Sequence, residues 1–294
     1  MMNKIVAVQG NHPSKLNPVT DTSVFLAHEI QNRRYKIFYY DPKNLSVINS
    51  KVIAKGFFIE FDYNKKKFFK ILKKQNLDLT LCKYILIRQD PPFNLEYISS
   101  TFILDAIKDK VKIINNPTSI RNISEKFYSA RYLKFMPNTI FTQNANIIKN
   151  FLKINKKIIL KPVHSFGGND IHLLSKLNVK LIKKLIKKHS FIMCQKFLPK
   201  ITKGDKRIFI INGKIVGAIS RIPKKGSFLS NMSKGAKPVN IDLTKKEKKI
   251  SNIVGKDLKK KNIFFAGIDF IDQKLNGDIN VTSPTGLKTL FDLS

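Results

Sequence analysis

Three oxygen-bearing side chains near the C-terminus could together bind a hard metal ion. Asp269 lies in an apolar run at 265–271, and Asp278 and Asn280 lie in the next run along the chain. Carboxylate and amide oxygens are the ligands that Mg²⁺ takes from proteins, usually while it keeps several waters and bridges to phosphates of a substrate. If the two runs are neighbouring β-strands, the sequence predicts a magnesium site that handles phosphates without a Walker loop.

Two turns could join these strands, and they place the acids differently. With Asn276-Gly277 as a hairpin turn, Asp269 and Asn280 would lie roughly 13 Å apart along the strands, too far to share one ion. With a turn at Asp272-Gln273 and the same glycine as the left-handed residue of a bulge, Asp269 comes within about 7 Å of Asp278 between α-carbons. We favour the earlier turn. An exposed hairpin with solvated acids is the alternative.

A glycine pair in the middle of the chain offers a second chemical feature. The loop at 163–170 contains Ser165-Phe166-Gly167-Gly168 between two apolar strands, and Lys161 ends the strand that enters it. Glycine allows backbone amides to approach phosphate groups closely, and the lysine is aimed at the same place. We therefore expect a flap that binds phosphates.

The first third of the chain must supply the sheet beside these features. Strand and helix patterns alternate there, which predicts an α/β fold with an open, mostly parallel sheet. Arg88 and Asp90 follow the carboxyl end of one strand, where open sheets place ligands, so both are candidates for a site. A structural ion pair is the alternative. The expected strands are 4–9, 36–40, 84–88 and 112–114, and the expected helices are 21–34 and 95–108.

The remaining elements are predicted from turn and cap signals. Asn212-Gly213 joins two antiparallel strands over 204–221, and the loop at 223–236, without periodicity, is either a lid or disordered. Thr244 and Glu247 form a capping box at the start of a helix. The buried face of that helix should consist of Ile250, Ile253, Val254 and Leu258. Further helices are expected at 125–135 and 145–154, and further strands at 157–161 and 191–198.

Size and cysteine usage limit the class of protein. A chain of 294 residues can form two or three compact units. Cys82 and Cys194 stand alone, so we expect neither a disulfide framework nor a zinc site. The apolar run at 5–8 is too short for a signal peptide, and no stretch approaches the ~18 apolar residues of a membrane span. These features predict a soluble, cytoplasmic protein without a membrane partner.

The net charge of +35 raises the question of a nucleic-acid partner. Only seven of the 55 basic residues are arginine, although arginine is the better bidentate ligand for phosphate. Abundant Lys, Asn, Ile and Phe without tryptophan is typical of an A+T-rich genome, to which we ascribe the charge. We expect adhesion to polyanions that weakens with salt, and no specific nucleic-acid partner.

Taken in order, these segments resemble prokaryotic-type glutathione synthetase, a member of the ATP-grasp superfamily, over nearly the whole chain. The resemblance implies an N-terminal substrate-binding α/β domain at 1–118, a central ATP-grasp lobe with the flap at 119–199, and a C-terminal lobe with lid and metal ligands at 200–294. The motifs that carry it are Arg88-Gln89-Asp90-Pro91-Pro92-Phe93, Asn115-Asn116-Pro117 through Glu125-Lys126, Ile158 to Pro162 with Gly167-Gly168, Gly204-Asp205-Lys206-Arg207, Gly267-Ile268-Asp269, and Ile279 to Gly286.

The resemblance also implies an activity and a role for each matching residue. The activity is ATP-dependent ligation of γ-glutamylcysteine to glycine through an acyl phosphate, with Mg²⁺ or Mn²⁺. The resemblance also implies a homo-oligomer, namely a tetramer. Arg207 would be catalytic and face the acyl phosphate. The implied nucleotide-binding residues are Lys126, Lys161, Ser165, Phe166, Gly167, Gly168, Gln195, Lys196, Phe197 and Leu198. The implied substrate-binding residues are Arg88, Asp205, Asn231, Ser283 and Thr285, and the implied metal ligands are Asp269, Asp278 and Asn280.

Three departures from the family pattern stand out. Asp278 replaces a glutamate, with one more residue in the turn before it. Leu229 stands where the lid of related enzymes has an arginine, which predicts weaker lid closure unless Lys224, Lys225 or Lys234 substitutes. The chain stops at Ser294, where the family continues into a further helix, so we expect an incomplete C-terminal edge.

Two other functions stay open on the sequence. One is a different ATP-grasp carboxylate-amine ligase, and the other is a catalytically decayed, basic binding protein with the same fold. Release of ADP that depends on γ-glutamylcysteine and glycine distinguishes them.

Overall fold

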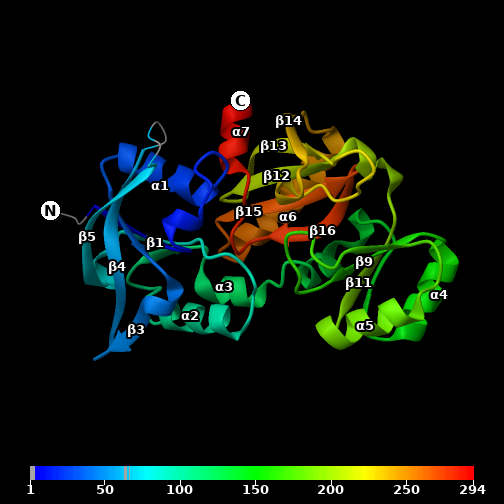
Figure 1. The fold of residues 1–294 in the computed structure, drawn as a ribbon, viewed down its shortest axis with the longest axis horizontal. Coiled ribbons are helices and arrows are strands. Elements are labelled where there is room, and N and C mark those ends of the chain that lie inside the picture. The colour runs from blue at the N-terminus through cyan, green and yellow to red at the C-terminus, as the bar shows by residue number, and fades with distance from the viewer. Residues whose placement is uncertain (1–3, 63–64, 66) are drawn as a thin grey trace.

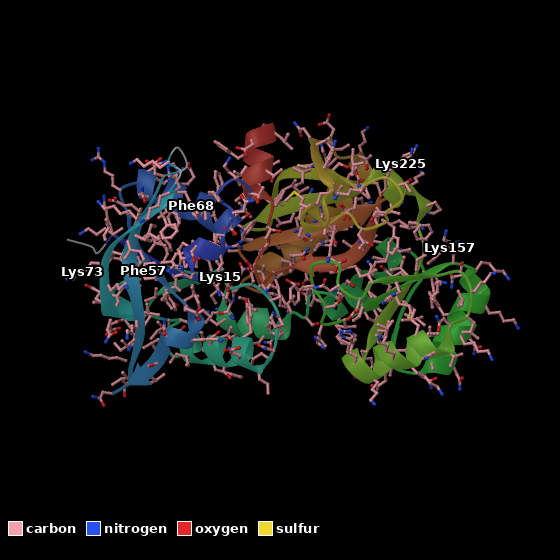
Figure 2. The ribbon with its side chains drawn as sticks, viewed as in Figure 1. Lys15, Phe57, Phe68, Lys73, Lys157 and Lys225 are labelled. Carbon is pink, nitrogen blue, oxygen red and sulfur yellow. The ribbon has the colours of Figure 1, made fainter. Side chains whose placement is uncertain are left out.

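The computed structural model describes residues 4–62, 65 and 67–294, which form three β-sheets with helices packed against them (Figure 1). The N-terminal sheet lies at one end of the molecule and the C-terminal sheet at its centre. The middle sheet lies at the other end with α4 (Ala145–Asn155) and α5 (Val179–His189). Lysine side chains extend from the outside of all three parts, as Lys73, Lys157 and Lys225 show in Figure 2.

The N-terminal sheet has seven strands and contains the parallel set that the sequence predicts. In order across the sheet, this set is β2 (Lys36–Tyr40), β1 (Ile5–Gln9), β6 (Tyr84–Ile87) and β7 (Lys112–Ile114). Three antiparallel strands that were not predicted extend the sheet beyond β2: β3 (Leu45–Ile48), β4 (Lys51–Phe61) and β5 (Phe69–Asp78). Most β5 side chains are exposed or half-buried, so the segment carries little of the apolar pattern of a buried strand.

Helices cover both faces of the parallel strands, which explains why those strands are apolar throughout. Val6 and Val8 of β1 pack with α1 (Thr22–Asn32) on one face. Ala7 packs on the other face, with α2 (Leu95–Asp105) and α3 (Pro117–Asn122). The carboxyl ends of β1 and β6 are thereby fixed toward the centre of the molecule.

The middle sheet is antiparallel and small. Its strands, in spatial order, are β10 (His172–Leu174), β9 (Ile158–Pro162), β11 (Ile192–Lys196) and β8 (Thr139–Thr142). Helices α4 and α5 bury their apolar stripes against it through Ile148, Phe151, Ile182 and Leu185. The loop between β9 and β10 is the predicted flap.

The C-terminal sheet is antiparallel, with five strands. In spatial order these are β14 (Lys237–Asn240), β13 (Lys214–Ile222), β12 (Asp205–Ile211), β15 (Phe265–Ile271) and β16 (Lys274–Asn280). One face packs against α6 (Lys245–Lys260) through Ile250, Val254 and Leu258. The other face packs against α7 (Leu287–Leu293) through Leu290.

Local signals in the sequence are largely confirmed in this sheet. Asn212 and Gly213 both have positive φ, at 49° and 78°, and join β12 to β13 as predicted. Asp272 and Gln273, with φ of 48° and 59°, join β15 to β16, so the favoured earlier turn is confirmed. The capping box of Thr244 and Glu247 is present.

Two details of the prediction are wrong. Ile253 is 39% exposed and does not belong to the buried face of α6. The segment predicted as a helix at 125–135 forms the 3₁₀ helix η4 (Phe127–Phe135), with a kink at Tyr132. Tyr132 and Tyr128 there donate hydrogen bonds to Asp257 of α6, which fixes the segment against the C-terminal sheet.

A buried asparagine ties the N-terminal sheet to the C-terminal one. Asn115, directly after β7, donates its side-chain amide to the carbonyl oxygens of Phe265 and Val281, both at 2.7 Å. Its oxygen accepts from the backbone amides of Phe264 at 2.9 Å and Phe265 at 2.8 Å. Four hydrogen bonds from one side chain therefore fix the start of β15 and the end of β16 beside the first domain.

Candidate functional site

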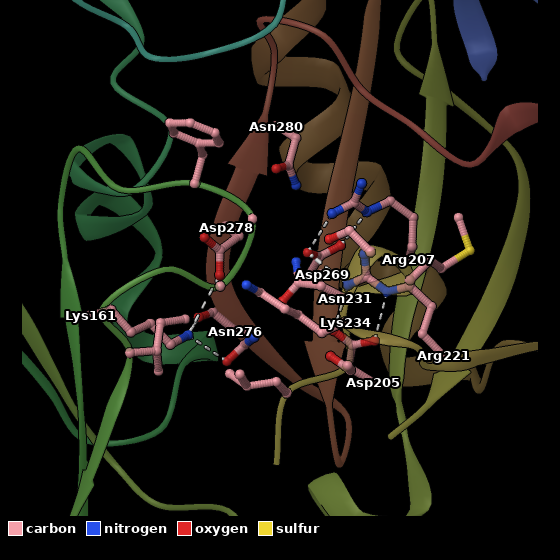
Figure 3. Close-up of a pocket in the computed structure, with 18 of the residues that line it drawn as sticks. Lys161, Asp205, Arg207, Arg221, Asn231, Lys234, Asp269, Asn276, Asp278 and Asn280 are labelled. Atoms are coloured by element: carbon pink, nitrogen blue, oxygen red, sulfur yellow. Dashed lines mark hydrogen bonds and ion pairs between the residues drawn. The ribbon is translucent and has the colours of Figure 1, made fainter. Parts of the chain in front are cut away.

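A cavity of about 990 Å³ lies between the three sheets. It is lined by residues of the middle and C-terminal sheets and by loop residues that follow strands of the N-terminal sheet, such as Asn11 and Asp90. Two charged groups lie on its walls, and Figure 3 labels all of their members except Lys126. The lysine group consists of Lys126, Lys161, Asn276 and Asp278. The arginine group consists of Asp205, Arg207, Arg221 and Asp269.

The arginine group is built by cross-strand pairing. Arg207 of β12 is directly opposite Asp269 of β15, and Asp205 of β12 is directly opposite Arg221 of β13. Because residues two apart on a strand face the same side, all four side chains project into the cavity. Gly267 makes room for them, since a Cβ there would lie 2.9 Å from Cδ of Arg207.

The four charges alternate and compensate one another. Arg207 donates to both carboxylate oxygens of Asp269, at 2.6 and 2.8 Å. Arg221 donates from Nε to Asp205 at 2.8 Å, and its Nη2 lies 3.0 Å from Asp269. Burial raises the pKa of Asp269, but the two guanidiniums outweigh burial and hold that pKa below its ordinary value. Burial raises the pKa of Asp205 above its ordinary value, and Arg221 opposes that rise.

The lysine group places two ammonium groups around one carboxylate. Lys126 and Lys161 each lie 3.5 Å from an oxygen of Asp278. Lys161 also donates to the backbone and side-chain oxygens of Asn276, at 2.8 and 2.9 Å, and Lys126 donates to the backbone oxygen of Ser165 at 2.6 Å. Burial lowers the pKa of Lys161, against the attraction of Asp278. The group keeps one excess positive charge, which suits it to an anion with several charges.

The predicted bulge is what brings Asp269 and Asp278 to one cavity. Ile268 pairs with Ile279, whereas the next pair is Phe270 with Leu275, so three residues of β16 are opposite Asp269. Gly277, the middle residue of the three, has φ of 87°. A Cβ at this position would lie 2.0 Å from Cε of Met193, so packing as well as conformation requires glycine.

The donor set of Asp269, Asp278 and Asn280 fits a metal that keeps several waters. Asn280 uses its amide nitrogen to donate to the carbonyl of Gly267 at 3.1 Å, and thereby fixes the orientation of its side chain. In the part of the chain that the structure describes, no group of three or more His, Cys, Asp or Glu side chains could hold a metal. Two carboxylates and one amide oxygen suit Mg²⁺, which takes hard oxygen ligands and retains water, better than a zinc ion.

The flap and the loop at 223–236 contact each other at the wall of the cavity. Gly167 and Gly168 of the flap have φ of 62° and 77°, so the backbone makes a tight turn there. A Cβ on Gly168 would lie 2.6 Å from Oδ1 of Asn231 in the lid, so the two loops are in contact. The structure describes the whole loop at 223–236, and Leu229, Asn231 and Lys234 of this loop line the cavity.

The part of the cavity wall at the end of β11, called here the slot, combines apolar and polar side chains. The slot is lined by Gln195, Lys196, Phe197 and Leu198 from the strand and its extension, with Ile159 and Ile201 beside them. Gln195 donates to Thr139 Oγ1 at 3.1 Å, which holds its side chain in place. A flat aromatic base would find apolar walls and peptide groups here.

The N-terminal domain closes the opposite end of the cavity with polar side chains. Asn11 donates to Asp90 at 2.7 Å. Burial, followed by the nearby Asp21 carboxylate, raises the pKa of Asp90. Arg88 is only 6% exposed and lies behind this wall, where its Nε donates to Ser23 at 3.1 Å. Its Nη1 is buried and has no hydrogen-bond partner among the residues that the structure describes.

The structure brings together all but one of the residues that the sequence singled out. Arg88 alone of this set is not among the residues that line the cavity. Those that line it are Lys126, Lys161, Ser165, Phe166, Gly167, Gly168, Gln195, Lys196, Phe197, Leu198, Asp205, Arg207, Asn231, Asp269, Asp278, Asn280, Ser283 and Thr285. Of the three lysines named as substitutes for the missing lid arginine, Lys234 lines the cavity.

Several cavity residues were not predicted, and Arg221 is the most informative of them. Counting back from the Asn212-Gly213 turn would pair Asp205 with Ser220. A bulge at 209–210 shifts the register by one, so Arg221 pairs with Asp205 instead. The sequence carries no local signal for that bulge. The other unpredicted lining residues with polar side chains include Asn11, Asn17, Thr20, Asp21, Glu125, Asn276 and Thr282.

Glu125 has a structural role at this site. Its Oε1 accepts hydrogen bonds from the backbone amides of Val281 and Thr282, at 2.9 and 3.1 Å, and from the Thr282 hydroxyl at 2.8 Å. The carboxylate thus anchors the chain where it leaves β16.

Across the described residues, no helix combines the length and the apolar character that crossing a bilayer would require.

Comparisons with known proteins give one family over almost the whole chain. A family model described as prokaryotic glutathione synthetase, N-terminal domain, matches residues 5–121, and one described as prokaryotic glutathione synthetase, ATP-grasp domain, matches residues 125–294. The chain is 34% identical to the glutathione synthetase of Agrobacterium fabrum, over 97% of this chain and 90% of the relative. It is 36% identical to the glutathione synthetase of Buchnera aphidicola, over 94% of this chain and 87% of the relative.

Solved structures with a similar fold include more distant ligases. D-cycloserine synthetase DcsG matches with a TM-score of 0.66 at 10% identity, over 97% of this chain and 94% of that one. D-alanyl-alanine synthetase A from Vibrio cholerae matches with a TM-score of 0.60 at 13% identity, over 98% of this chain and 92% of that one. At these identities the likeness shows the ATP-grasp fold alone.

Proposed function

Since the chain belongs to the prokaryotic glutathione synthetase family, we propose that it ligates γ-glutamylcysteine to glycine and converts ATP to ADP and phosphate in the same reaction. The observation that carries the proposal is the convergence of the lysine group and the arginine group in one cavity. Its volume of about 990 Å³ is at the upper end of the range for small-molecule sites, as a nucleotide and a peptide bound together require.

The lysine group would bind the phosphates of ATP. Lys126 and Lys161 are held at the cavity wall, at 3.5 Å from the same carboxylate, so little reorganisation is needed when a phosphate takes its place. Backbone amides of Ser165 to Gly168 in the flap would cover the phosphates. The slot at Gln195 to Leu198 would hold the adenine.

The arginine group would stabilise the charge that develops at the reacting carbonyl. The peptide carboxylate attacks the terminal phosphorus of ATP, which forms the acyl phosphate and releases ADP. The amine of glycine then attacks the acyl carbon, and phosphate leaves as the amide forms. Arg207 and Arg221 are buried and held in place by Asp269 and Asp205, so they would act as fixed donors that lower the barrier without reorganising.

Asp269, Asp278 and Asn280 would hold Mg²⁺, with Mn²⁺ as the possible alternative. A bound divalent ion would offset the negative charge of the phosphates during transfer. Asp278 is the better placed of the two acids, because Asp269 already accepts hydrogen bonds from two arginines.

The peptide substrate would lie at the end of the cavity formed by the N-terminal domain. Ser283, Thr285 and Asn231 line the cavity and are the proposed direct contacts. Asp205 is committed to Arg221, and Arg88 would act from behind the wall by fixing the backbone there, where its carbonyl accepts from Ser283 Oγ at 3.3 Å.

Release of ADP tests the activity. With Mg²⁺, ATP, γ-glutamylcysteine and glycine all present, we expect steady release of ADP. Omission of either γ-glutamylcysteine or glycine should abolish this turnover. Turnover with a different acceptor but not with glycine would indicate another carboxylate-amine ligase. Absence of turnover with every acceptor, from a folded protein, would support a decayed binding protein instead.

Location and assembly are further parts of this proposal. A reducing cytoplasm is supported by two cysteines, Cys82 and Cys194, that are both buried and free. We propose a homo-tetramer on the family resemblance, and light scattering on the purified protein would test it. The division into domains at 1–118, 119–199 and 200–294 is likewise proposed, supported by three separate sheets in those ranges.

A further inference from the structure

The three lysines of the lid occupy different environments. Lys234 lines the central cavity, whereas Lys224 and Lys225 do not. Lys224 packs along the lid itself, with its Cε 2.1 Å from where a Cβ on Gly235 would be. At the position of Leu229 the cavity wall is apolar. The lid therefore presents an ammonium group to the cavity five residues after that leucine.

Lys234 connects the lid to the flap. Its Nζ lies 3.3 Å from Oδ1 of Asn169, one residue after the glycine pair. Beside it, Asn231 of the lid lies against Gly168 of the flap. Figure 3 shows Lys234 and Asn231 between the arginine group and the side chains of Lys161 and Asn276. Two adjacent contacts, through Lys234 and Asn231, therefore join the lid to the flap at the wall of the cavity.

Lys234 has a neutral hydrogen-bond partner, whereas the other cationic side chains near it lie beside carboxylates. Lys126 and Lys161 lie near the carboxylate of Asp278, and Arg207 bonds the carboxylate of Asp269. Lys234 bonds a neutral amide at a long distance, and its side chain is exposed. An ammonium group has three donors, so it can keep Asn169 and bind an anion as well.

We propose that Lys234 is the phosphate-binding residue of the lid, and that Asn169 of the flap positions it. When ATP is bound, the ammonium contacts the terminal phosphate from the side opposite the lysine group, so the flap and the lid close as one unit. The inference rests on the proposed function, because it takes ATP as the ligand. It assigns to Lys234 the cation that Leu229 does not supply.

The test is equilibrium binding of a non-hydrolysable ATP analogue and of ADP, with Mg²⁺ and without peptide, by titration calorimetry on the full chain. We expect Lys234→Ala to weaken binding of the analogue about tenfold, as loss of a hydrogen bond to a charged group implies. Binding of ADP should change less than about twofold, because the terminal phosphate is absent. Lys225→Ala, in the same loop but outside the cavity, is the matched control and should bind both as the wild type does. Lys234→Arg should restore binding of the analogue.

A second comparison tests the positioning role of Asn169. Asn169→Ala should weaken binding of the analogue by about threefold, and the double variant Asn169→Ala/Lys234→Ala should be no weaker than Lys234→Ala alone. Adding Leu229→Arg to Lys234→Ala should recover the lost affinity. All of these side chains are exposed or half-buried, so the variants should fold, which circular dichroism would check.

The outcomes separate the inference from the proposed function. If wild-type protein binds no nucleotide, the proposed function itself is wrong. If the wild type binds the analogue but Lys234→Ala binds it as tightly as Lys225→Ala, Lys234 is not the phosphate-binding residue of the lid. If Lys234→Ala weakens ADP and the analogue equally, its contact is not with the terminal phosphate, and the inference is overturned.

Discussion

Removal of the Arg221 guanidinium should destabilise the fold in a way that depends on pH. Arg221 and Asp205 are 5% and 2% exposed, and the two are paired directly across β12 and β13. In Arg221→Gln, Asp269 keeps Arg207, but Asp205 loses the guanidinium that pairs with it. Breaking a buried ion pair by removal of one partner costs about 3–5 kcal/mol. We expect a loss of that size in the free energy of unfolding at pH 8.

The sign of the pH dependence follows from the pKa of Asp205. Burial already raises this pKa, and Arg221 is the charge that opposes the rise, so the variant raises it further. An acid whose pKa is higher in the folded state than in the unfolded state binds its proton more tightly when folded. The variant should therefore be most stable at low pH. It should lose stability, by up to about 1.4 kcal/mol per pH unit, as the pH rises from near 4 toward the folded pKa.

Urea unfolding followed by circular dichroism at pH 5.5 and pH 8 measures both effects. In Asp205→Asn/Arg221→Gln both charges are absent, so the double variant should be more stable than Arg221→Gln at pH 8 and less sensitive to pH. Lys200→Gln, which breaks an exposed ion pair with Asp272, is the control and should cost less than about 1 kcal/mol. A loss at pH 8 no greater than that of the control, or a double variant no more stable than the single one, would refute the reasoning.

Three further changes test other parts of the site. Asn115→Ala removes four buried hydrogen bonds and should lower the free energy of unfolding by about 2–4 kcal/mol in chemical denaturation, whereas a change below ~1 kcal/mol would contradict its linking role. Gly277→Ala forces a Cβ against Met193 at a positive φ and should lower the free energy of unfolding by about 2–4 kcal/mol. Truncating Met193 as well should recover only the part of this loss that comes from the steric clash. Recovery of the whole loss would rule out a contribution from the backbone conformation. Asp278→Asn should raise the Mg²⁺ concentration for half-maximal ADP release about tenfold or more, while Asp278→Glu should not, and an unchanged Mg²⁺ requirement in Asp278→Asn would exclude it as a ligand.

The parts of the fold that the sequence predicts are those with local physical signals. The Asn212-Gly213 and Asp272-Gln273 turns, the Thr244 cap and the buried parallel strands depend on residues within a few positions of one another. The bulge at Gly277 belongs here too, because a hairpin with a left-handed glycine has few alternatives. These signals were sufficient to place Asp269 and Asp278 on adjacent strands.

The parts that were not predicted depend on register or on distant contacts. Arg221 pairs with Asp205 only because of the bulge at 209–210, which no residue type in the sequence indicates. Asn11 and Asp21 lie in loops of the N-terminal domain and reach the cavity through the packing of whole sheets. Arg88 directly follows β6, which ends at Ile87, but its side chain points into a buried wall, which the strand pattern cannot distinguish from the cavity side.

The lysine group explains why nucleotide and metal should bind together. Before ATP arrives, Asp278 lies at 3.5 Å from both Lys126 and Lys161 and partly neutralises two buried ammonium groups. Phosphates that take over these lysines leave Asp278 beside a second anion, which is unfavourable in a buried cavity. A divalent cation held by Asp278 would remove that repulsion. The same carboxylate would then stabilise the empty site and make each ligand raise the affinity for the other, as thermodynamic linkage requires.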